Sequence, residues 1–322
     1  MINPVAQTFF VDSSLYSQGV YVTSVDICFK KIDRLTYMPF TLQLRPTING
    51  FPHSSLIYPF GEVTKSAGNM IAYDYPSLND ITIPTYTRFS FVTPVFLLPG
   101  EHAIVLSTNS DQYEVYVAQM GQTYLDGSER LVSEQPYAGS FFKSQNGSTY
   151  TPYQDIDLMF RVNKCVFDTN RTGSIVFNNV KSDTKIYADV VNLGTQDLTF
   201  KNTEIDYYYE ATDNTSSTLS NFTSFNPLTN IYLNNRIKVD TTGNTFILRA
   251  NLSSSDENVS PMINMDRLHL IAVSSSINNG GLKAGDFTIT NGGSGYTGNT
   301  TVTITGTTGS GANAYAVVAN GN

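Results

Sequence analysis

The chain has 322 residues, of which 40% are apolar and only 14% are charged, and its formal net charge is −8. The charged fraction is well below the average of about 25% for globular domains, so Ser, Thr, Asn and Gln supply most of the polar surface. This acidic balance disfavours nucleic acid as a partner, because phosphate binding depends on Lys and Arg. We also expect no membrane insertion, because no apolar run approaches the ~20 residues of a membrane helix.

Amide- and hydroxyl-rich sequences disfavour helix interiors, and alternation with period two predicts half-buried strands throughout the first 165 residues. The first clear strand spans residues 20–29, and the residues expected on its core face are Tyr21, Val25, Ile27 and Phe29. The same alternation predicts strands over 40–45, 113–117 and 155–162. Residues 102–106 are apolar on both faces after the first, which predicts a strand buried on both sides.

Turn signals separate these strands, at Asn49-Gly50, Pro99-Gly100, Asp126-Gly127 and Asn146-Gly147. Strands spaced in this way are typical of an antiparallel sandwich, which we place at residues 1–165. Pro94 and Pro99 flank the apolar run 95–98. Because proline cannot donate to a strand ladder, we expect this strand to be short or at a sheet edge.

A second β domain is predicted over residues 166–276, with strands near 174–177, 186–191, 205–209, 246–250 and 269–273. The Asn/Ser/Thr-rich stretch 212–229 predicts a long loop. Residues 277–322 form a Gly/Thr-rich segment that resembles one unit of a β repeat, and such units usually need neighbours. We therefore predict an all-β chain of tandem antiparallel β-sandwich domains followed by this repeat segment. We also expect these 322 residues to be part of a longer polypeptide.

No pattern of catalytic or ligating residues emerges from the sequence. The three histidines are far apart, and neither a nucleophile elbow, a Walker loop nor a zinc-protease motif occurs. Asp155 and Asp157 share a strand face, but such spacing is more typical of a solvated face than of a catalytic acid pair. Cys28 and Cys165 are expected to be buried thiols, although one bridge between them stays open. We expect no enzyme, no cofactor and no metal.

Aromatic residues are dense between positions 113 and 153, and several fall in predicted loops. The candidates for contact with a neighbouring subunit or a glycan are Tyr113, Tyr116, Tyr124, Tyr137, Phe141 and Phe142. Aromatic side chains are enriched at the centres of interfaces, which favours this interpretation. Ordinary core packing is the alternative, because aromatic rings bury large areas wherever they lie.

Several short segments of the chain match no general catalytic or binding motif but are characteristic of a protein family. They are residues 6–10 (AQTFF), 22–27 (VTSVDI), 43–46 (QLRP), 49–52 (NGFP), 107–111 (STNSD), 135–140 (QPYAGS), 249–252 (RANL), 258–261 (NVSP) and 266–268 (DRL). Together they resemble structural tail proteins of T4-like contractile-tailed phages, especially those that infect marine cyanobacteria. Members of that family are large baseplate-wedge or tail-associated proteins built from β modules.

The resemblance implies a virion structural protein, located in the tail and assembled in the host cytoplasm. Its implied partners are other tail or baseplate proteins, in a homo-oligomer or another symmetric assembly, and no catalytic residue is carried over. Such a protein should expose apolar patches when it is isolated. The alternative is a receptor-binding tail fibre or adhesin module that recognises a host surface glycan through tyrosines of the 113–153 region.

Overall fold

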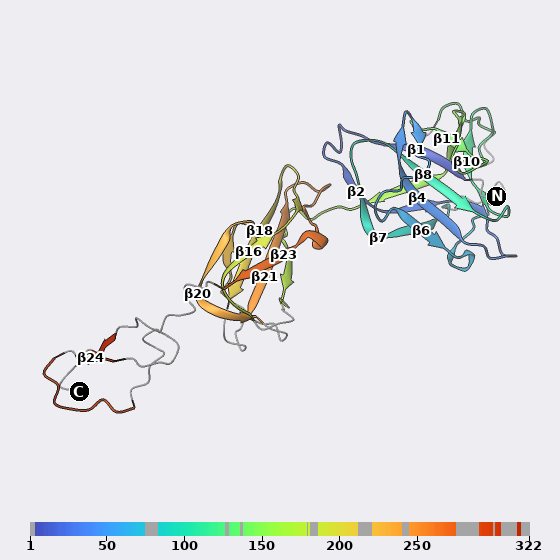
Figure 1. Ribbon diagram of the computed structural model, residues 1–322. Coiled ribbons are helices and arrows are strands. Elements are labelled where there is room, and N and C mark those ends of the chain that lie inside the picture. Colours follow the sequence, from blue (N-terminus) through green and yellow to red (C-terminus); the bar gives the residue numbers. More distant parts are fainter. Residues whose placement is uncertain are drawn as a thin grey trace. The chain divides into compact units, whose positions relative to one another are not determined.

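The computed structural model describes residues 4–74, 83–125, 129–135, 138–178, 180, 186–211, 221–239, 245–274, 290–298, 300–303 and 314–316 (Figure 1). Within these residues the regular elements are strands, apart from single 3-10 turns at Ala67–Asn69 and Met265–Arg267. The strands pair antiparallel in several sheets, so the all-β prediction is confirmed.

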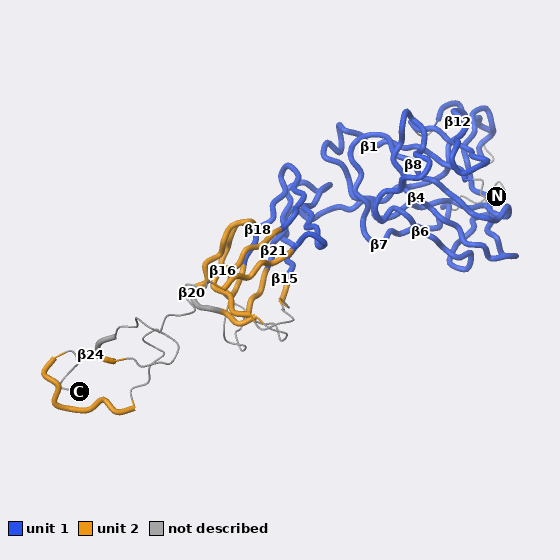
Figure 2. The backbone as a smooth tube through the Cα atoms, viewed as in Figure 1, with its two compact units in different colours: residues 1–176, 195–208, 249–268 blue, residues 177–194, 209–248, 269–322 orange. Residues whose placement is uncertain are grey.

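Two compact units interleave along the chain (Figure 2). Unit 1 comprises residues 1–176, 195–208 and 249–268, and unit 2 comprises residues 177–194, 209–248 and 269–322. The units interleave because β18 (Thr203–Ala211) and β21 (Phe246–Ser254) each contribute residues to both. The three consecutive domains predicted from the sequence, 1–165, 166–276 and 277–322, stay a prediction.

A seven-stranded antiparallel sheet forms one layer of unit 1. Its order is β12 (Thr151–Tyr153), β11 (Phe141–Lys143), β1 (Val5–Val11), β8 (Gly100–Thr108), β4 (Phe40–Ile48) and β5 (Phe51–Pro52), with β6 (Glu62–Lys65) also paired to β4. The second layer is a three-stranded sheet of order β14 (Phe160–Lys164), β2 (Val20–Ile27) and β7 (Thr87–Leu97).

Shorter pairs of strands complete unit 1. They are β3 (Phe29–Lys31) with β9 (Glu114–Val115), β10 (Val117–Gln119) with β13 (Ile156–Leu158), and β17 (Asp197–Leu198) with β22 (Met262–Ile263). Asn49 and Gly50 join β4 to β5 with φ angles of 53° and 80°. Both angles are positive, as a type I′ hairpin turn requires, so the Asn-Gly signal marks a real hairpin.

One hydrophobic core joins the two layers of unit 1. Its buried side chains come from β1, β4, β8 and β11 of one sheet and from β2, β7 and β14 of the other. Phe40, Leu42 and Leu44 enter it from one face of β4, as their alternation predicts. All residues from His102 to Leu106 are buried, which confirms the prediction for β8. A core between two antiparallel sheets is the sandwich that the sequence predicts for this region.

The predicted core face of β2 is wrong at Tyr21. Thr23 is an extra residue opposite β14, and the register of β2 with β7 shifts at the same place, between Val22 and Ser24. Such a bulge reverses which side chains point inward. Val22 therefore joins Val25 in the sandwich core, whereas Tyr21 turns to the other side. There Tyr21 contacts the rings of Phe96 and Phe167 at centroid distances of 5.0 and 5.4 Å.

The run flanked by prolines lies on an edge strand, as predicted, but that strand is long. β7 has 11 residues and pairs with β2 alone in its sheet. Val22 pairs with Val95 and Ser24 with Ser90, so residues 91–94 bulge away from β2. Pro94 lies in this bulge, where no ladder hydrogen bond is required of it.

The single strand predicted over 113–117 is divided at Tyr116. β9 pairs with β3 before this residue, and β10 pairs with β13 after it. The change of partner turns Tyr116 inward against Cys28 and Tyr73, and it leaves Val117 exposed. The expected alternation through Val117 is therefore wrong.

The remaining sheets contain the strands predicted for the second half of the chain. One sheet has the order β15 (Gly173–Phe177), β21, β18 and β19 (Thr223–Phe225). The other has the order β20 (Asn230–Val239), β16 (Ile186–Gly194) and β23 (His269–Val273). Two strands were not predicted: β20, and β19, which lies inside the predicted loop 212–229.

The Gly/Thr-rich segment contributes one described pair of strands, β24 (Thr300–Val302) with β25 (Ala314–Ala316). Most of the other residues of the predicted repeat lie outside the described part of the chain. A repeat architecture for residues 277–322 therefore stays a prediction.

Candidate functional site

Three of the six predicted contact aromatics are buried side chains of unit 1. Phe141 belongs to the core between the two sheets. Phe142 points to the opposite face of the seven-stranded sheet and packs against Tyr150. The Tyr116 hydroxyl donates a hydrogen bond to the backbone carbonyl of Tyr73 at 3.1 Å. For these three residues the structure favours the alternative of ordinary core packing.

The other three predicted aromatics differ in their surroundings. Tyr113 is half-buried against the sandwich core, its hydroxyl donates to the Met38 carbonyl at 2.6 Å, and burial raises its pKa. Tyr124 is exposed, with the guanidinium of Arg130 5.2 Å from its ring centroid. Tyr137 lies outside the described residues. Tyr124 is thus the one exposed ring among the described members of the six.

A second candidate surface, which the sequence did not suggest, lies on the sheet β20-β16-β23 of unit 2 (Figure 1). We call it the unit 2 face and define it as Tyr187, Val190, Tyr232, Ile271 and Val273. Tyr232 is 73% exposed, and Ile271 and Val273 are about half exposed. Such large apolar side chains on one sheet face are unusual for a surface that stays in water.

Strand register explains why these side chains share one face. Val190 pairs with Tyr232 on one side and with Val273 on the other, and Ile271 lies two residues from Val273 on the same strand. The neighbouring positions point the other way, where Val191 and Ile231 are buried. Period two therefore gives the sheet an apolar inner face and a second, exposed apolar face.

The unit 2 face was missed in the sequence for two reasons. β20 was not predicted as a strand, although Ile231, Leu233, Ile237 and Val239 recur with period two, and that alternation could have revealed it. Alternation also cannot tell which face of a strand is covered when both faces carry apolar residues.

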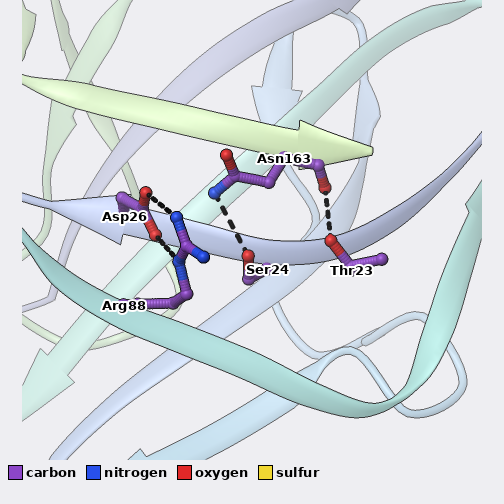
Figure 3. A network of polar contacts seen from close by, with 5 residues as sticks. All are labelled: Thr23, Ser24, Asp26, Arg88 and Asn163. Atoms are coloured by element: carbon purple, nitrogen blue, oxygen red, sulfur yellow. Dashed lines mark hydrogen bonds and ion pairs between the residues drawn. The ribbon is translucent and has the colours of Figure 1, made fainter. Parts of the chain in front are cut away.

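A third surface is polar and follows the outward side of β2 at the three-stranded sheet (Figure 3). Asp26 is almost fully buried between its neighbours, and Arg88 donates Nε and Nη2 hydrogen bonds to its two carboxylate oxygens at 2.8 and 3.0 Å. Asn163 Nδ2 donates to Ser24 Oγ at 3.1 Å, and Thr23 Oγ1 donates to the Asn163 carbonyl at 3.1 Å.

Cross-strand pairing aligns these groups in rows. Asp26 pairs with Arg161 on β14 and with Arg88 on β7. The guanidinium of Arg161 lies over the Tyr86 ring at 4.1 Å, which holds this exposed cation beside the carboxylate. The row Arg161–Asp26–Arg88 holds the three strands in register on the side of the sheet remote from the core. The contact between Arg88 and Asp26 is a bidentate ion pair, which is a structural arrangement rather than one for acid–base catalysis.

The Asp26 carboxylate should make stability depend on pH. Burial raises its pKa, but hydrogen bonds from Arg88 and Asn163 and the charges of both arginines outweigh burial, so the net pKa is lowered. A lowered folded-state pKa adds stability above the ordinary Asp value of about 4, and this contribution disappears as pH falls below it. We expect Asp26→Asn to lower the free energy of unfolding at neutral pH. We also expect the free energy of unfolding of this variant to fall less than that of the unmodified protein when the pH is lowered.

Urea unfolding of both proteins at neutral pH and at about pH 3 measures this difference. Asp155→Asn is the matched control, since Asp155 is exposed and its carboxylate accepts a hydrogen bond from the uncharged Gln119 side chain at 3.0 Å. Equal acid sensitivity in Asp26→Asn and the unmodified protein would contradict the role given to Asp26.

The described residues do not form a catalytic acid pair from Asp155 and Asp157. The expected solvated face is wrong for Asp157, which is buried and accepts a hydrogen bond from Gln7. Asp155 is exposed, as that expectation requires. Among the described residues no group of three or more His, Cys, Asp or Glu side chains is placed to hold a metal ion. The described part of the chain also contains no helix with the length and apolarity needed to cross a membrane.

Both cysteines are free thiols, so no bridge joins Cys28 to Cys165. Cys28 is fully buried and burial raises its pKa to about 11, whereas Cys165 is only half-buried. The expectation of a buried thiol therefore holds for Cys28 alone.

Fold and surfaces together define an all-β protein of sandwich architecture with one exposed apolar sheet face and one polar, ion-paired sheet face. Comparison with protein-family models, with curated proteins and with solved structures finds no match.

Proposed function

We propose that this chain is a structural component of a phage tail, of the baseplate or tail-associated kind, and that it acts through protein–protein contacts. The observation that carries the proposal is the unit 2 face, because a virion building block is expected to expose apolar surface until it is assembled. The family resemblance of the strings in the first 165 residues supports the same assignment.

The chemistry of the unit 2 face fits a protein partner. The rows centred on Val190 and Asn192 contain only uncharged residues, and the Asn192 amide donates to Asn230 at 3.1 Å. Interface cores are likewise depleted of charge and enriched in Tyr. β20 and β23 are the two edges of this sheet, so a neighbouring subunit could also add a strand there.

The partner that we propose is another tail subunit, either a second copy or a different tail protein. Ile271→Lys places a charge on the unit 2 face and should reduce incorporation into assembled tails by about tenfold or more, because an unpaired charge buried at an interface is costly. Incorporation is measured by complementing a phage that lacks the gene and quantifying the chain in purified tails.

Val92→Lys is the matched control, since Val92 is an apolar residue that is 98% exposed but lies in unit 1. It should be incorporated as well as the unmodified chain. Both variants should keep the unmodified thermal transition, which separates assembly from folding. Equal incorporation of Ile271→Lys and Val92→Lys would contradict assembly through the unit 2 face.

A further inference from the structure

An amine and a carboxamide from distant parts of unit 1 meet at the end of β14. Lys164 Nζ donates a hydrogen bond to Asn258 Oδ1 at 2.7 Å, although the two residues are 94 positions apart. Both side chains are half-buried, and the ring of Tyr16 lies 5.4 Å from the amine. Because Oδ1 is bonded to the carboxamide carbon, the amine stands next to an electrophilic carbon.

A carboxylate completes the group on the other side of the carboxamide. Asp256 Oδ1 accepts hydrogen bonds from Asn258 Nδ2 at 3.2 Å and from the Asn258 backbone N–H at 2.9 Å. Gln18 Nε2 donates to the second oxygen of Asp256 at 3.3 Å, which orients the carboxylate. An amine, a carboxamide and a carboxylate are therefore in consecutive contact.

The loop that carries Asn258 is fixed on both sides of this residue. The Phe167 backbone N–H donates to the Glu257 carbonyl at 2.8 Å, and the Tyr21 hydroxyl donates to the Ser260 carbonyl at 2.7 Å. Val259 is fully buried between them. Holding two reactive groups in contact in this way raises their effective concentration strongly.

We propose that Lys164 and Asn258 form an intramolecular isopeptide bond, with Asp256 as the group that transfers protons. The ammonium loses a proton to solvent, and the neutral amine attacks the carboxamide carbon of Asn258. Asp256 then passes the proton that the attacking nitrogen gives up to the amide nitrogen that it contacts, the C–N bond to that nitrogen breaks, and ammonia leaves. One C–N bond forms, one breaks, and no oxidant or cofactor is needed.

This bond would join β14 to the loop after β21 and close a loop of about 90 residues in the covalent chain. Closing so long a loop restricts the unfolded chain, and in the entropic model this stabilises the folded state. The inference rests on the contacts of unit 1 alone and does not depend on the proposed tail function.

The test is the intact mass of the full chain, measured after prolonged incubation in a mildly alkaline buffer. The proposal predicts a mass lower than that of the sequence by one ammonia. Proteolysis should then release a branched peptide that joins the segments containing Lys164 and Asn258. An intact mass equal to that of the sequence after this incubation would overturn the proposal.

Lys164→Arg separates the isopeptide from succinimide formation at Asn-Gly pairs such as Asn49-Gly50, which also releases ammonia. This variant should keep the full mass and yield no branched peptide. Lys143→Arg is the matched control, since Lys143 also lies over a tyrosine ring, Tyr153, at 4.7 Å. It should still lose one ammonia, and an unchanged loss in Lys164→Arg would refute the proposed bond.

Discussion

Phe29→Ala should lower the free energy of unfolding by about 4 kcal/mol, because it removes a fully buried ring from the centre of the sandwich core. The ring lies edge-on to Phe40 at a centroid distance of 4.9 Å and within 6.3 Å of Phe89 and Tyr113. These neighbours lie on β4, on β7 and just before β9, so no single side-chain movement can fill the cavity. Urea unfolding monitored by tyrosine fluorescence measures the loss.

Phe10→Ala is the control for this substitution, since Phe10 is 54% exposed at the end of β1. We expect it to change the free energy of unfolding by about 1 kcal/mol or less, because most of its ring already contacts water. If the two variants were equally stable, Phe29 would not lie at the centre of the core described for unit 1.

Gln7→Ala should cost about 3 kcal/mol, although it removes a polar side chain. Gln7 is fully buried on the core face of β1. Its Oε1 accepts a hydrogen bond from the Leu158 backbone N–H at 2.9 Å, and its Nε2 donates to Asp157 Oδ1 at 3.1 Å. Truncation would leave these buried partners without the amide and would open a cavity between β1 and β13.

Gln119→Ala provides a matched comparison, because Gln119 Nε2 donates to Asp155 Oδ2 at 3.0 Å in an exposed pair of the same chemistry. Water can replace that bond, so we expect a change within about 0.5 kcal/mol. Equal urea midpoints for Gln7→Ala and Gln119→Ala would show that burial of the Gln7 amide contributes nothing to stability.

The regular strands were predictable because their pattern is local. Phe40, Leu42 and Leu44 alternate with polar residues, and one face of β4 is buried accordingly. The Asn49-Gly50 turn was predictable for a similar reason, since few residue pairs adopt two successive positive φ angles. The final predicted strand, 269–273, also matches β23.

The departures from prediction arise where pairing between distant strands decides the outcome. The bulge at Thr23 depends on β7 and β14, which are 60 or more residues away in the chain, and it reverses the expected direction of Tyr21. Asp157 was expected in solvent because acidic side chains are usually exposed. It is buried instead, and the Gln7 amide donates a hydrogen bond to its carboxylate. Neither partner can be identified from local alternation.

The candidate surfaces were harder to predict than the fold. Aromatic density around 113–153 does not distinguish a core ring such as Phe141 from an exposed ring such as Tyr124, since both count equally as aromatic residues. The unit 2 face combines residues of three strands, and only the register of β16 with β20 and β23 brings Tyr232 and Val273 to opposite sides of Val190.

The most direct measurement for the proposed function is immunogold labelling of intact phage particles with an antibody to residues 1–165. We expect label at a fixed ring near the end of the tail, or on dissociated tails if assembly covers the epitope. Label at the tips of extended fibres would instead favour the receptor-binding alternative. Absence of label from both intact particles and dissociated tails would contradict the assignment to the tail.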